Sequence, residues 1–490
     1  MRAHGTGRGG KGWRDGSFRS VGERERGGGH MGHRLEPFAE IGLDEAMLAH
    51  LIERHRDRTV PGLDRLWNYY RNPEIGRRGD GRSMLAQERG LPGRLRGLGW
   101  EASTDGRDLP EAVIENDIAW RIDALVEFLF GKPIRLRSTA DDADRRAEIE
   151  RAIDSVLDSS GGMGLLQNSA LMAAVYGWVD FIVRSDAAGV RIEPVAPTRG
   201  IPIVDPTDYR RLLGYIIRTE QTGRIEAESR RTIRAVLGGM RRRARRHEVI
   251  EILSATHRQV YADGVLVAEE PNALGVLPVV HVQNTGQPLR YAGQSDVEPL
   301  IPLQDELNTR LSDRARRITM QSFNMYLAKG LELDSPLPIG PGQLWMTQNP
   351  DADITAFGGD GHSPSEDRHI EEIREAMDKT SSVSPAVLGV IRTKLGHLSS
   401  ANALRIAMLG VLSRTDRKRA LFGRGIQGVC GLVLHAMDLA GVLRTDEGER
   451  GVRIEWRDPL PRTQEELLRE ARLKVDLGVS QERVLEELGY

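Results

Sequence analysis

Three acidic residues close together, Asp141, Asp142 and Asp144, form the first group in the sequence that suggests catalytic chemistry. Carboxylates at such spacing can hold a divalent cation for hydrolysis. However, they come directly before a stretch with helical periodicity, where acidic side chains interact favourably with the positive end of the helix dipole. We therefore expect helix capping, and a metal-dependent nuclease role remains the alternative.

Motifs for nucleotide, covalent or metal chemistry are missing from the sequence. It contains no G-x-x-x-x-G-K-[ST] phosphate loop, no G-x-S-x-G elbow and no H-E-x-x-H helix. The single cysteine, Cys430, excludes a disulfide scaffold and a multi-cysteine zinc site, and it fits a reducing cytoplasm. Its neighbours Val429, Leu432 and Val433 predict a small buried hydrophobe. The sequence thus predicts no catalytic residue, no metal and no cofactor.

Two groups of arginines are candidates for contact with phosphate or with acidic surfaces. The first is the run Arg241, Arg242, Arg243, Arg245 and Arg246. No helix or aromatic platform accompanies this run, so we expect a solvated loop or subunit contact, with DNA contact as the alternative. The second group, Arg310, Arg314, Arg316 and Arg317, alternates with Asp305, Glu306 and Asp313. For this group we expect ion pairs between subunits first and phosphate contacts second.

The overall composition limits the function classes. The chain has 490 residues, with 69 Lys and Arg against 71 Asp and Glu. This near-balance argues against a protein whose whole surface binds nucleic acid or anionic lipid. No run approaches ~18 apolar residues, so no membrane span is expected. Residues 1–34 are rich in glycine and arginine and predict a disordered tail.

The first half of the chain predicts a helical body that carries a β-rich part. Apolar spacing from Leu43 to Tyr70 predicts two short helices on either side of Pro61 and Gly62, followed by a loop over 72–110. Further helices are expected over 118–130, 144–157 and 165–176. Alternating patterns predict strands over 134–138, 179–184, 192–195, 201–204, 214–219, 249–253, 258–261, 265–268 and 276–282, with a turn at Asp263 and Gly264.

The second half predicts a pair of helices separated by a Pro/Gly-rich insert. The first runs from Pro299 to Lys329, about 28 residues or ~42 Å long. The insert, Leu331–Gly361, has candidate strands at 344–347 and 354–357. The second helix begins with Ser363 as cap and Pro364 at its first position, and ends at Lys379. Its apolar stripe is too thin for a monomer's core, so the helix should face water, a channel or other copies.

A polar segment and a further long helix follow the pair. Ser381–Leu404 is polar and punctuated by glycine, and a helix is expected from Ser400 to about Ala440. A strand over 452–456 and helices over 463–477 and 480–488 complete the chain.

Several segments in this order resemble the portal proteins of tailed bacteriophages, in the branch found in siphophages of Gram-positive hosts. The matching segments are HLIERHRDRTVPGLDRLWNYYRNP, NDIAWRIDALVEFLFGKPIRLRS, AAVYGWVDFIVRSD, PVAPTRGIPIVDPTDYRRLLGYIIRTE and VLPVVHVQNT. They are followed by the long helix from Ser295 and by the helix, loop, helix series Glu366–Ala440 with its SSANAL turn. Together they extend from about Ala46 to Leu488. The acidic C-terminal tail of some relatives is missing here.

The resemblance implies an α+β portal-protein fold with a mixed α/β wing, long stem helices, a small α/β clip and a short helical crown. The corresponding ranges are a wing over 35–294, stem helices over 295–329 and 363–380, and a clip over 330–362. A tunnel loop over 381–400, a long helix of the wing or crown over 401–450 and a short crown over 451–490 complete the assignment.

The same resemblance implies a structural subunit, not an enzyme, of a homo-oligomeric ring of about a dozen copies in the virion, assembled in the host cytoplasm. Double-stranded DNA would pass through the ring during packaging and ejection. The implied partners are the terminase large subunit, a head–tail adaptor, and capsid and scaffold proteins, with no membrane. The alternative is a phage-encoded enzyme acting on nucleic acid or nucleotides.

Candidate site residues follow from these implied roles. For the DNA channel they are Arg392, Lys394, His397, Ser399 and Ser400 of the tunnel loop, and for the stem Arg310, Arg314 and Arg317. For partner binding by the clip they are Leu337, Ile339, Trp345 and Met346.

Overall fold

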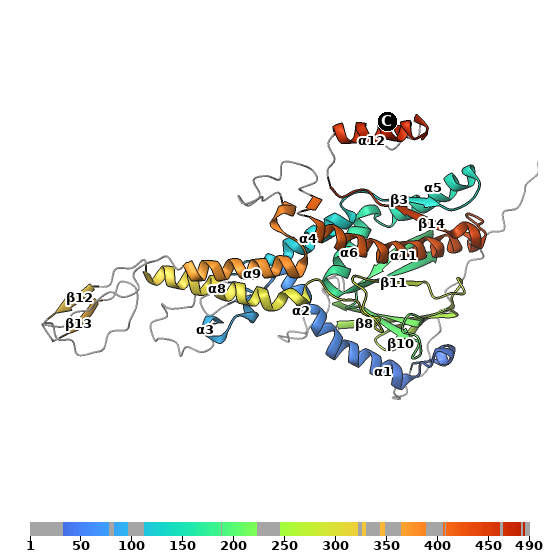
Figure 1. Cartoon of the computed structure of the whole chain (residues 1–490). Helices are drawn as coiled ribbons and strands as arrows, with labels where there is room; N and C mark the ends of the chain where they lie inside the picture. The colour runs from blue at the N-terminus through green and yellow to red at the C-terminus, as the bar shows by residue number, and fades with distance from the viewer. Residues whose placement is uncertain are drawn as a thin grey trace, which may run out of the picture.

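A computed structural model describes residues 33–77, 83–96, 112–187, 189–222, 246–321, 326–329, 344–347, 364–388, 405–406, 408–460, 464–481 and 484–485. The body is layered, and two long helices, α8 and α9, leave it together on one side (Figure 1). The C-terminal helix α12 stands apart on another side. The fold class is α+β, as predicted.

The first helices join without a break, which corrects the predicted interruption at Pro61 and Gly62. Helix α1 (Glu45–Arg54) starts at Asp44, whose carboxylate accepts a hydrogen bond from the Met47 N–H at 2.7 Å. A π-helical turn, His55–Thr59, links α1 to α2 (Val60–Arg71). The wider turn relieves the clash between a proline ring and the carbonyl four residues earlier, so Pro61 is accommodated at the start of α2.

The region predicted as a loop after α2 contains short elements. A hairpin, β1 (Glu74–Arg77) and β2 (Ser83–Leu85), precedes the 3-10 turn η3 (Ala86–Gly90) and the short helix α3 (Gly93–Arg96). Helix α4 (Asp117–Phe130) and strand β3 (Arg135–Ser138) follow, with α5 (Ala143–Ser159) and α6 (Gly162–Tyr176) after them. These four elements agree with the sequence periodicity.

Two antiparallel sheets pack face to face in the body. One has the order β11-β4-β5, built from β4 (Trp178–Asp186), β5 (Gly189–Val195) and β11 (Val279–Gln283). The other has the order β10-β9-β8-β7-β6, built from β6 (Gly200–Val204), β7 (Leu212–Thr222), β8 (Arg246–Ser254), β9 (His257–Ala262) and β10 (Val265–Pro271).

The residues between and around these sheets account for their stability. Ile182, Val195, Ile217 and Leu253 are buried between them, and α1 covers the outer face of the larger sheet. Both residues of the predicted turn have positive φ, 51° at Asp263 and 79° at Gly264, which is typical of a two-residue hairpin.

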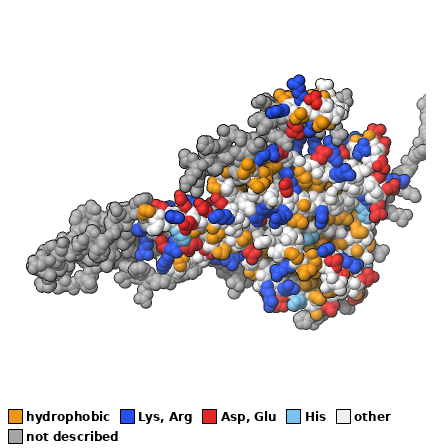
Figure 2. All heavy atoms as spheres, in the orientation of Figure 1, with side chains coloured by type: hydrophobic (Ala, Val, Ile, Leu, Met, Phe, Trp, Pro, Cys, Tyr) orange, Lys and Arg blue, Asp and Glu red, His pale blue; other side chains and the backbone are white. Residues whose placement is uncertain are grey.

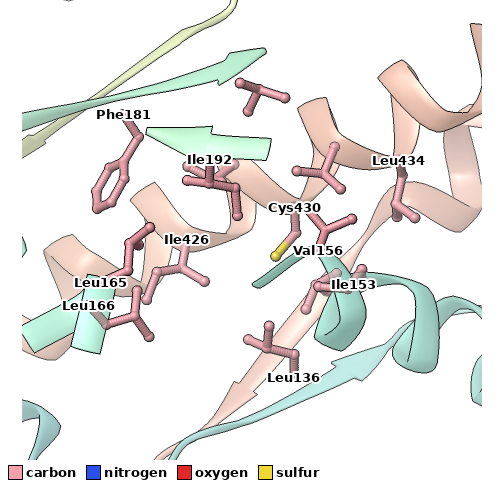
Figure 3. Close-up of a cluster of buried hydrophobic side chains, with 14 of the residues drawn as sticks. Leu136, Ile153, Val156, Leu165, Leu166, Phe181, Ile192, Ile426, Cys430 and Leu434 are labelled. Carbon is pink, nitrogen blue, oxygen red and sulfur yellow. The ribbon is translucent and has the colours of Figure 1, made fainter. Parts of the chain in front are cut away.

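The main core surrounds helix α11 (Leu409–Leu439). Figure 3 shows Cys430 among Ile153, Val156 and Ile192, which come from α5 and β5. Burial raises the pKa of the Cys430 thiol to about 12, so the side chain is an inert hydrophobe, as predicted. Among the described residues, α11 alone has the length and composition of a membrane span, and half of its most apolar window is buried in the protein.

The long helix predicted from Ser400 is interrupted at Met408. Arg405 and Ile406 are helical, Met408 has φ −100° and ψ 7°, and the regular helix α11 starts at Leu409. After it come the 3-10 turn η8 (Glu447–Arg450), strand β14 (Val452–Glu455), which pairs with β3, and helix α12 (Gln464–Asp476). Gln481, Val484 and Leu485 are helical in the final predicted helix.

The helix pair departs from prediction at its far end. A 3-10 turn, η5 (Glu298–Leu300), leads into α8 (Ile301–Gln321), which ends before the expected Lys329. Instead, β12 (Tyr326–Lys329) pairs in parallel with β13 (Leu344–Thr347), so a backbone ladder replaces helical hydrogen bonds there. Helix α9 (Pro364–Ser381) begins at the predicted proline, and the turn η6 (Pro385–Leu388) follows it. The predicted cap Ser363 and strand 354–357 lie outside the described residues.

Candidate functional site

Helices α8 and α9, called the arm below, pack through a narrow apolar seam. Leu307 and Leu311 of α8 lie in one buried cluster with Ile370, Ile373 and Met377 of α9. The cluster continues into the body through residues of α2, α4 and α6. The thin stripe of α9 is therefore buried within one chain, contrary to expectation. The opposite side of α9 faces solvent, because the helix buries only four of its 18 residues, namely Ile370, Ile373, Met377 and Ser381.

Ion pairs reinforce the seam along its length. The Arg314 guanidinium lies 3.2 Å from Asp367, and Arg317 pairs with Glu366. Arg310 pairs with Glu306 at 2.7 Å, one helical turn away. Burial would raise the pKa of Glu306, but Arg310 and His369 hold it below its ordinary value. These arginines were expected to pair between subunits, whereas the carboxylates they contact belong to the same chain.

A ladder of polar side chains joins α8 to the segment that precedes α4. Gln304, Asn308 and Ser312 are buried and lie one turn apart on α8. Their side chains accept hydrogen bonds from backbone N–H groups of the segment: Asp117 to Gln304 (3.1 Å), Glu115 to Asn308 (3.0 Å) and Val113 to Ser312 (2.9 Å).

The amide side chains of this region also donate hydrogen bonds. The Asn308 amide donates to Gln87 Oε1 at 3.0 Å, and the Gln87 amide donates to Asn116 Oδ1 at 2.8 Å. Buried polar groups are costly without partners, so this network fixes the register of α8 on the body.

Arg121 of α4 binds the end of α9. The side chain is only 1% exposed, and its Nη1 donates to Asp378 (2.6 Å) and to the Val383 carbonyl (2.7 Å). Its Nη2 donates to Asp117 at 2.9 Å, one turn earlier on α4. The two carboxylates and the carbonyl compensate the buried guanidinium in charge and satisfy its Nη1 and Nη2 groups, whereas its buried Nε makes no hydrogen bond to the described residues. Arg121 thus holds the C-terminal end of α9 against α4.

Arg414 of α11 connects the two points at which the arm joins the body, the segment before α8 and the end of α9. Its Nη1 donates to the carbonyls of Thr380 (3.1 Å) and Ser381 (3.0 Å) at the end of α9. Its Nη2 donates to Asp296 at 2.6 Å, just before η5 and α8. One side chain therefore ties the entry and the exit of the arm to the central helix of the body.

Asp296 and Lys418 form a buried ion pair beside Arg414. Their side chains are 2% and 4% exposed, and Lys418 Nζ lies 2.5 Å from Asp296 Oδ2. Burial alone would raise the pKa of Asp296, but the charges of Lys418 and Arg414 outweigh it and hold that pKa below its ordinary value. Lys418 also donates to Asn284. We call Arg121, Asp296, Arg414 and Lys418 the root cluster.

The root cluster is not among the features predicted from the sequence. Arg414 and Lys418 are spaced four apart and so share a face of α11, but nothing near them in sequence supplies an acid on that face. Asp296 is 118 residues from Arg414, and Asp378 is 257 residues from Arg121. In the sequence Lys418 stands in a charged run, and only its helical spacing from Val411 and Phe422 places it on the apolar face of α11, where a lysine needs a buried partner.

Of the three acids Asp141, Asp142 and Asp144, Asp142 caps a helix, as expected. The Asp142 carboxylate accepts a hydrogen bond from the Arg145 N–H at 2.9 Å, at the start of α5. Among the described residues, no group of three or more His, Cys, Asp or Glu could hold a metal ion.

One cleft lies beside the arm. Its volume is about 340 Å³, and it opens between α2 and the start of α8, with Arg65, Trp178, Arg290 and Glu298 among its lining residues. The residues that line this cleft include neither a cysteine nor a histidine.

Several predicted site residues cannot be placed. Leu337 and Ile339 of the clip, and all five tunnel-loop candidates (Arg392, Lys394, His397, Ser399 and Ser400), lie outside the described residues. Trp345 and Met346 lie on β13, opposite Leu327 and Ala328. Of the basic run, Arg246 is the first residue of β8, and the other four lie outside the described residues.

A family model for phage portal proteins, SPP1 Gp6-like, matches residues 49–489. The chain belongs to this family. It is accordingly a structural subunit of a virion portal vertex, as the sequence resemblance implied. No curated protein matches this portal protein.

Solved structures with some likeness to this portal protein come from gene transfer agent (GTA) particles. One is the virion of a native GTA particle, with 11% identity, a TM-score of 0.38, and 75% of this chain and 88% of that chain covered. Another is the neck of an empty GTA particle, with 14% identity, a TM-score of 0.39 and the same coverage.

Proposed function

We propose that copies of this chain assemble into a closed ring, and that the arms of the ring surround a channel through which double-stranded DNA passes during packaging and ejection. The arm is the observation that carries the proposal. Helix α8 has 21 residues, or ~32 Å, and it leaves the body beside α9 (Figure 1). A rigid projection fixed at its root is what copies need in order to converge on one axis.

The parts of the chain take the following roles in this proposal. Residues 35–294 form the wing, α8 and α9 the stem, and 330–362 the clip. Residues 381–400 form the tunnel loop, which begins where Arg121 and Arg414 hold the end of α9. Residues 401–450 belong to the wing or crown, and 451–490 form a short crown.

The charge distribution supports sliding of DNA in preference to tight binding. Each phosphate contact releases counterions and strengthens binding, so a strongly basic channel would hold the duplex. On the arm, arginines and acids of one chain pair with each other. Figure 2 accordingly shows red and blue side chains mixed along the arm. Contact with phosphate falls to the tunnel-loop candidates Arg392, Lys394 and His397, with Ser399 and Ser400.

The partners follow from the proposed position at the vertex. The clip, through Leu337, Ile339, Trp345 and Met346, would bind the terminase large subunit during packaging and a head–tail adaptor afterwards. The wing would contact capsid and scaffold proteins, and no membrane is involved. The virion portal would assemble in the host cytoplasm.

The chain has no enzymatic activity of its own in this proposal. Asp142, the best-placed acid of the sequence cluster, is engaged in capping α5. Neither the wild type nor Asp142→Ala should show ATPase or nuclease turnover above background. Wild-type turnover that disappears in Asp142→Ala would contradict the proposal.

Size-exclusion chromatography with light scattering tests the proposal. One chain has a mass of 54.4 kDa. A closed ring of about a dozen copies would elute as a single particle of several hundred kilodaltons, independent of concentration above its assembly threshold. A monomer or dimer across the whole concentration range would contradict the ring.

A further inference from the structure

Helix α12 exposes more large apolar side chains than its size would suggest. Leu468 is 62% exposed, Leu473 56%, Val475 42% and Leu477 84%. These four residues fall within ten positions, and α12 stands apart from the layered body in Figure 1. A concentration of exposed leucine and valine on one short helix indicates a protein contact.

The apolar residues occupy two opposite sides of α12. Leu468 and Val475 are seven residues apart and share one side, here called face A. Leu473 precedes Val475 by two residues, which turns it by ~200° to the other side, and Leu477 lies one turn further along that side. Leu473 and Leu477 form face B. A helix that docked on its own body would need only one apolar face.

We propose that α12 packs between the α12 helices of the two adjacent copies in the ring, with face A of one copy against face B of the next. The inference rests on the proposed ring. A contact between two different faces is heterologous, and it closes into a ring when the rotation between copies closes. Each helix then has two neighbours, which accounts for its two apolar faces.

The polar flanks of α12 fit a parallel neighbour of the same sequence. Glu470 and Lys474 lie on one flank, 3.2 Å apart, and Arg472 and Asp476 lie on the other. The second flank also carries Arg469, so both flanks hold charges of both signs. In a parallel arrangement, Lys474 of one copy lies beside Glu470 of the next and Arg472 beside Asp476, which favours the same sequence as partner.

The size of the helix makes this a contact of the assembled ring. Thirteen residues span only ~20 Å, too little buried area for a stable dimer. Within a ring the body contacts hold the helices close together, and the effective concentration makes a small contact productive.

Thiol cross-linking of the full chain tests the arrangement. Leu473→Cys and Val475→Cys place thiols on opposite faces at nearly the same height, while the native Cys430 is buried and does not react. With a short bis-maleimide, the double variant should yield a covalent ladder that extends beyond the dimer toward the full ring. Each single variant should remain largely monomeric on a denaturing gel, and rings mixed from the two single variants should stop at dimers.

A charge substitution provides an independent measurement. Leu473→Glu should raise the concentration needed for half-assembly by ~10-fold or more, whereas Arg469→Glu, exposed on a polar flank, should change it less than ~2-fold. If the wild-type chain forms rings, but the double cysteine variant gives no cross-linked ladder and Leu473→Glu assembles normally, the inference is overturned and the proposed ring is not. Dimers from a single variant would indicate like faces in contact and would also overturn it. A wild-type chain that forms no ring would instead contradict the proposed function.

Discussion

The root cluster and the outer face of α9 use the same kinds of charged side chain in opposite surroundings. In the root cluster, Asp296 and Lys418 are almost completely buried, and each makes several charged hydrogen bonds. On the outer face, Arg368 and Glu372 are 81% and 58% exposed and lie 3.2 Å apart on one helix. Buried charges without a partner are very costly, whereas exposed pairs are screened by water. The root cluster should therefore fix the direction of the arm, and the outer face should leave it unaffected.

The largest difference between the two regions should come from Asp296→Ala. This change leaves Lys418 and Arg414 without their shared carboxylate in a buried site. Removal of one partner from such a group costs ~3–5 kcal/mol in the free energy of unfolding. Urea titration followed by tryptophan fluorescence measures it. The matched control is Asp416→Ala on α11, the helix that carries Arg414 and Lys418. Asp416 is 74% exposed and 3.8 Å from Arg419, so the expected loss is below ~1 kcal/mol. Equal losses from both variants would contradict the comparison.

A smaller loss is expected from Asn308→Leu in the polar ladder. The leucine cannot accept from the Glu115 N–H or donate to Gln87, so buried polar groups lose their partners. Each such group costs ~1–3 kcal/mol. Arg368→Leu on the outer face of α9 is the control and should change stability by less than ~0.5 kcal/mol. The same urea titration measures both variants. An Asn308→Leu protein as stable as the Arg368→Leu control would show that the polar ladder does not stabilise the fold.

The pH dependence of unfolding should reveal the contribution of the buried Asp296 carboxylate. The folded-state pKa of Asp296 lies below its ordinary value of 3.8, so its stabilising contribution is complete above that value and is lost as the pH falls through the folded pKa. Between about pH 5 and pH 2, wild type should lose stability more steeply than Asp296→Asn, by up to ~1.4 kcal/mol per pH unit. Denaturant titrations at each pH measure the two slopes. Parallel curves would mean that Asp296 does not carry the dependence.

The smallest effect should follow from Glu375→Gln on the outer face. Glu375 and Lys379 are 62% and 80% exposed and lie 4.0 Å apart. We expect a change below ~0.5 kcal/mol that vanishes near 1 M salt, where screening acts over only ~3 Å. Thermal melts at low and high salt measure it. A loss above ~2 kcal/mol that persists in salt would show that the outer face also carries structure.

Local patterns predicted most of the helices and strands, and long-range pairing decided the rest. The boundaries of α4 follow from apolar spacing and from Asn116, whose side chain accepts a hydrogen bond from the Ala119 N–H. By contrast, β12 was predicted as helix, because its ladder with β13 joins residues 18 positions apart. The π turn before Pro61 also has no simple pattern in the sequence.

The candidate site was predicted in outline and missed at its root. The interrupted helix pair is readable because each helix has its own apolar stripe and start signal. The arginines of α8 were identified, but their partners were placed on another subunit. The fold supplies Asp367 and Glu366 from α9, about 50 residues further along the chain. The root cluster combines residues of α4, α11 and the segment before α8, and it holds the end of α9, so no local spacing predicts it.

Electron-microscopic averaging of the assembled full chain shows where the arms lie in the ring. We expect closed rings in which the α8–α9 arms converge on one central axis and surround an open channel, with the sheets of the body at the outside. Rings with the arms on the periphery, or particles with no central channel, would contradict the proposed channel.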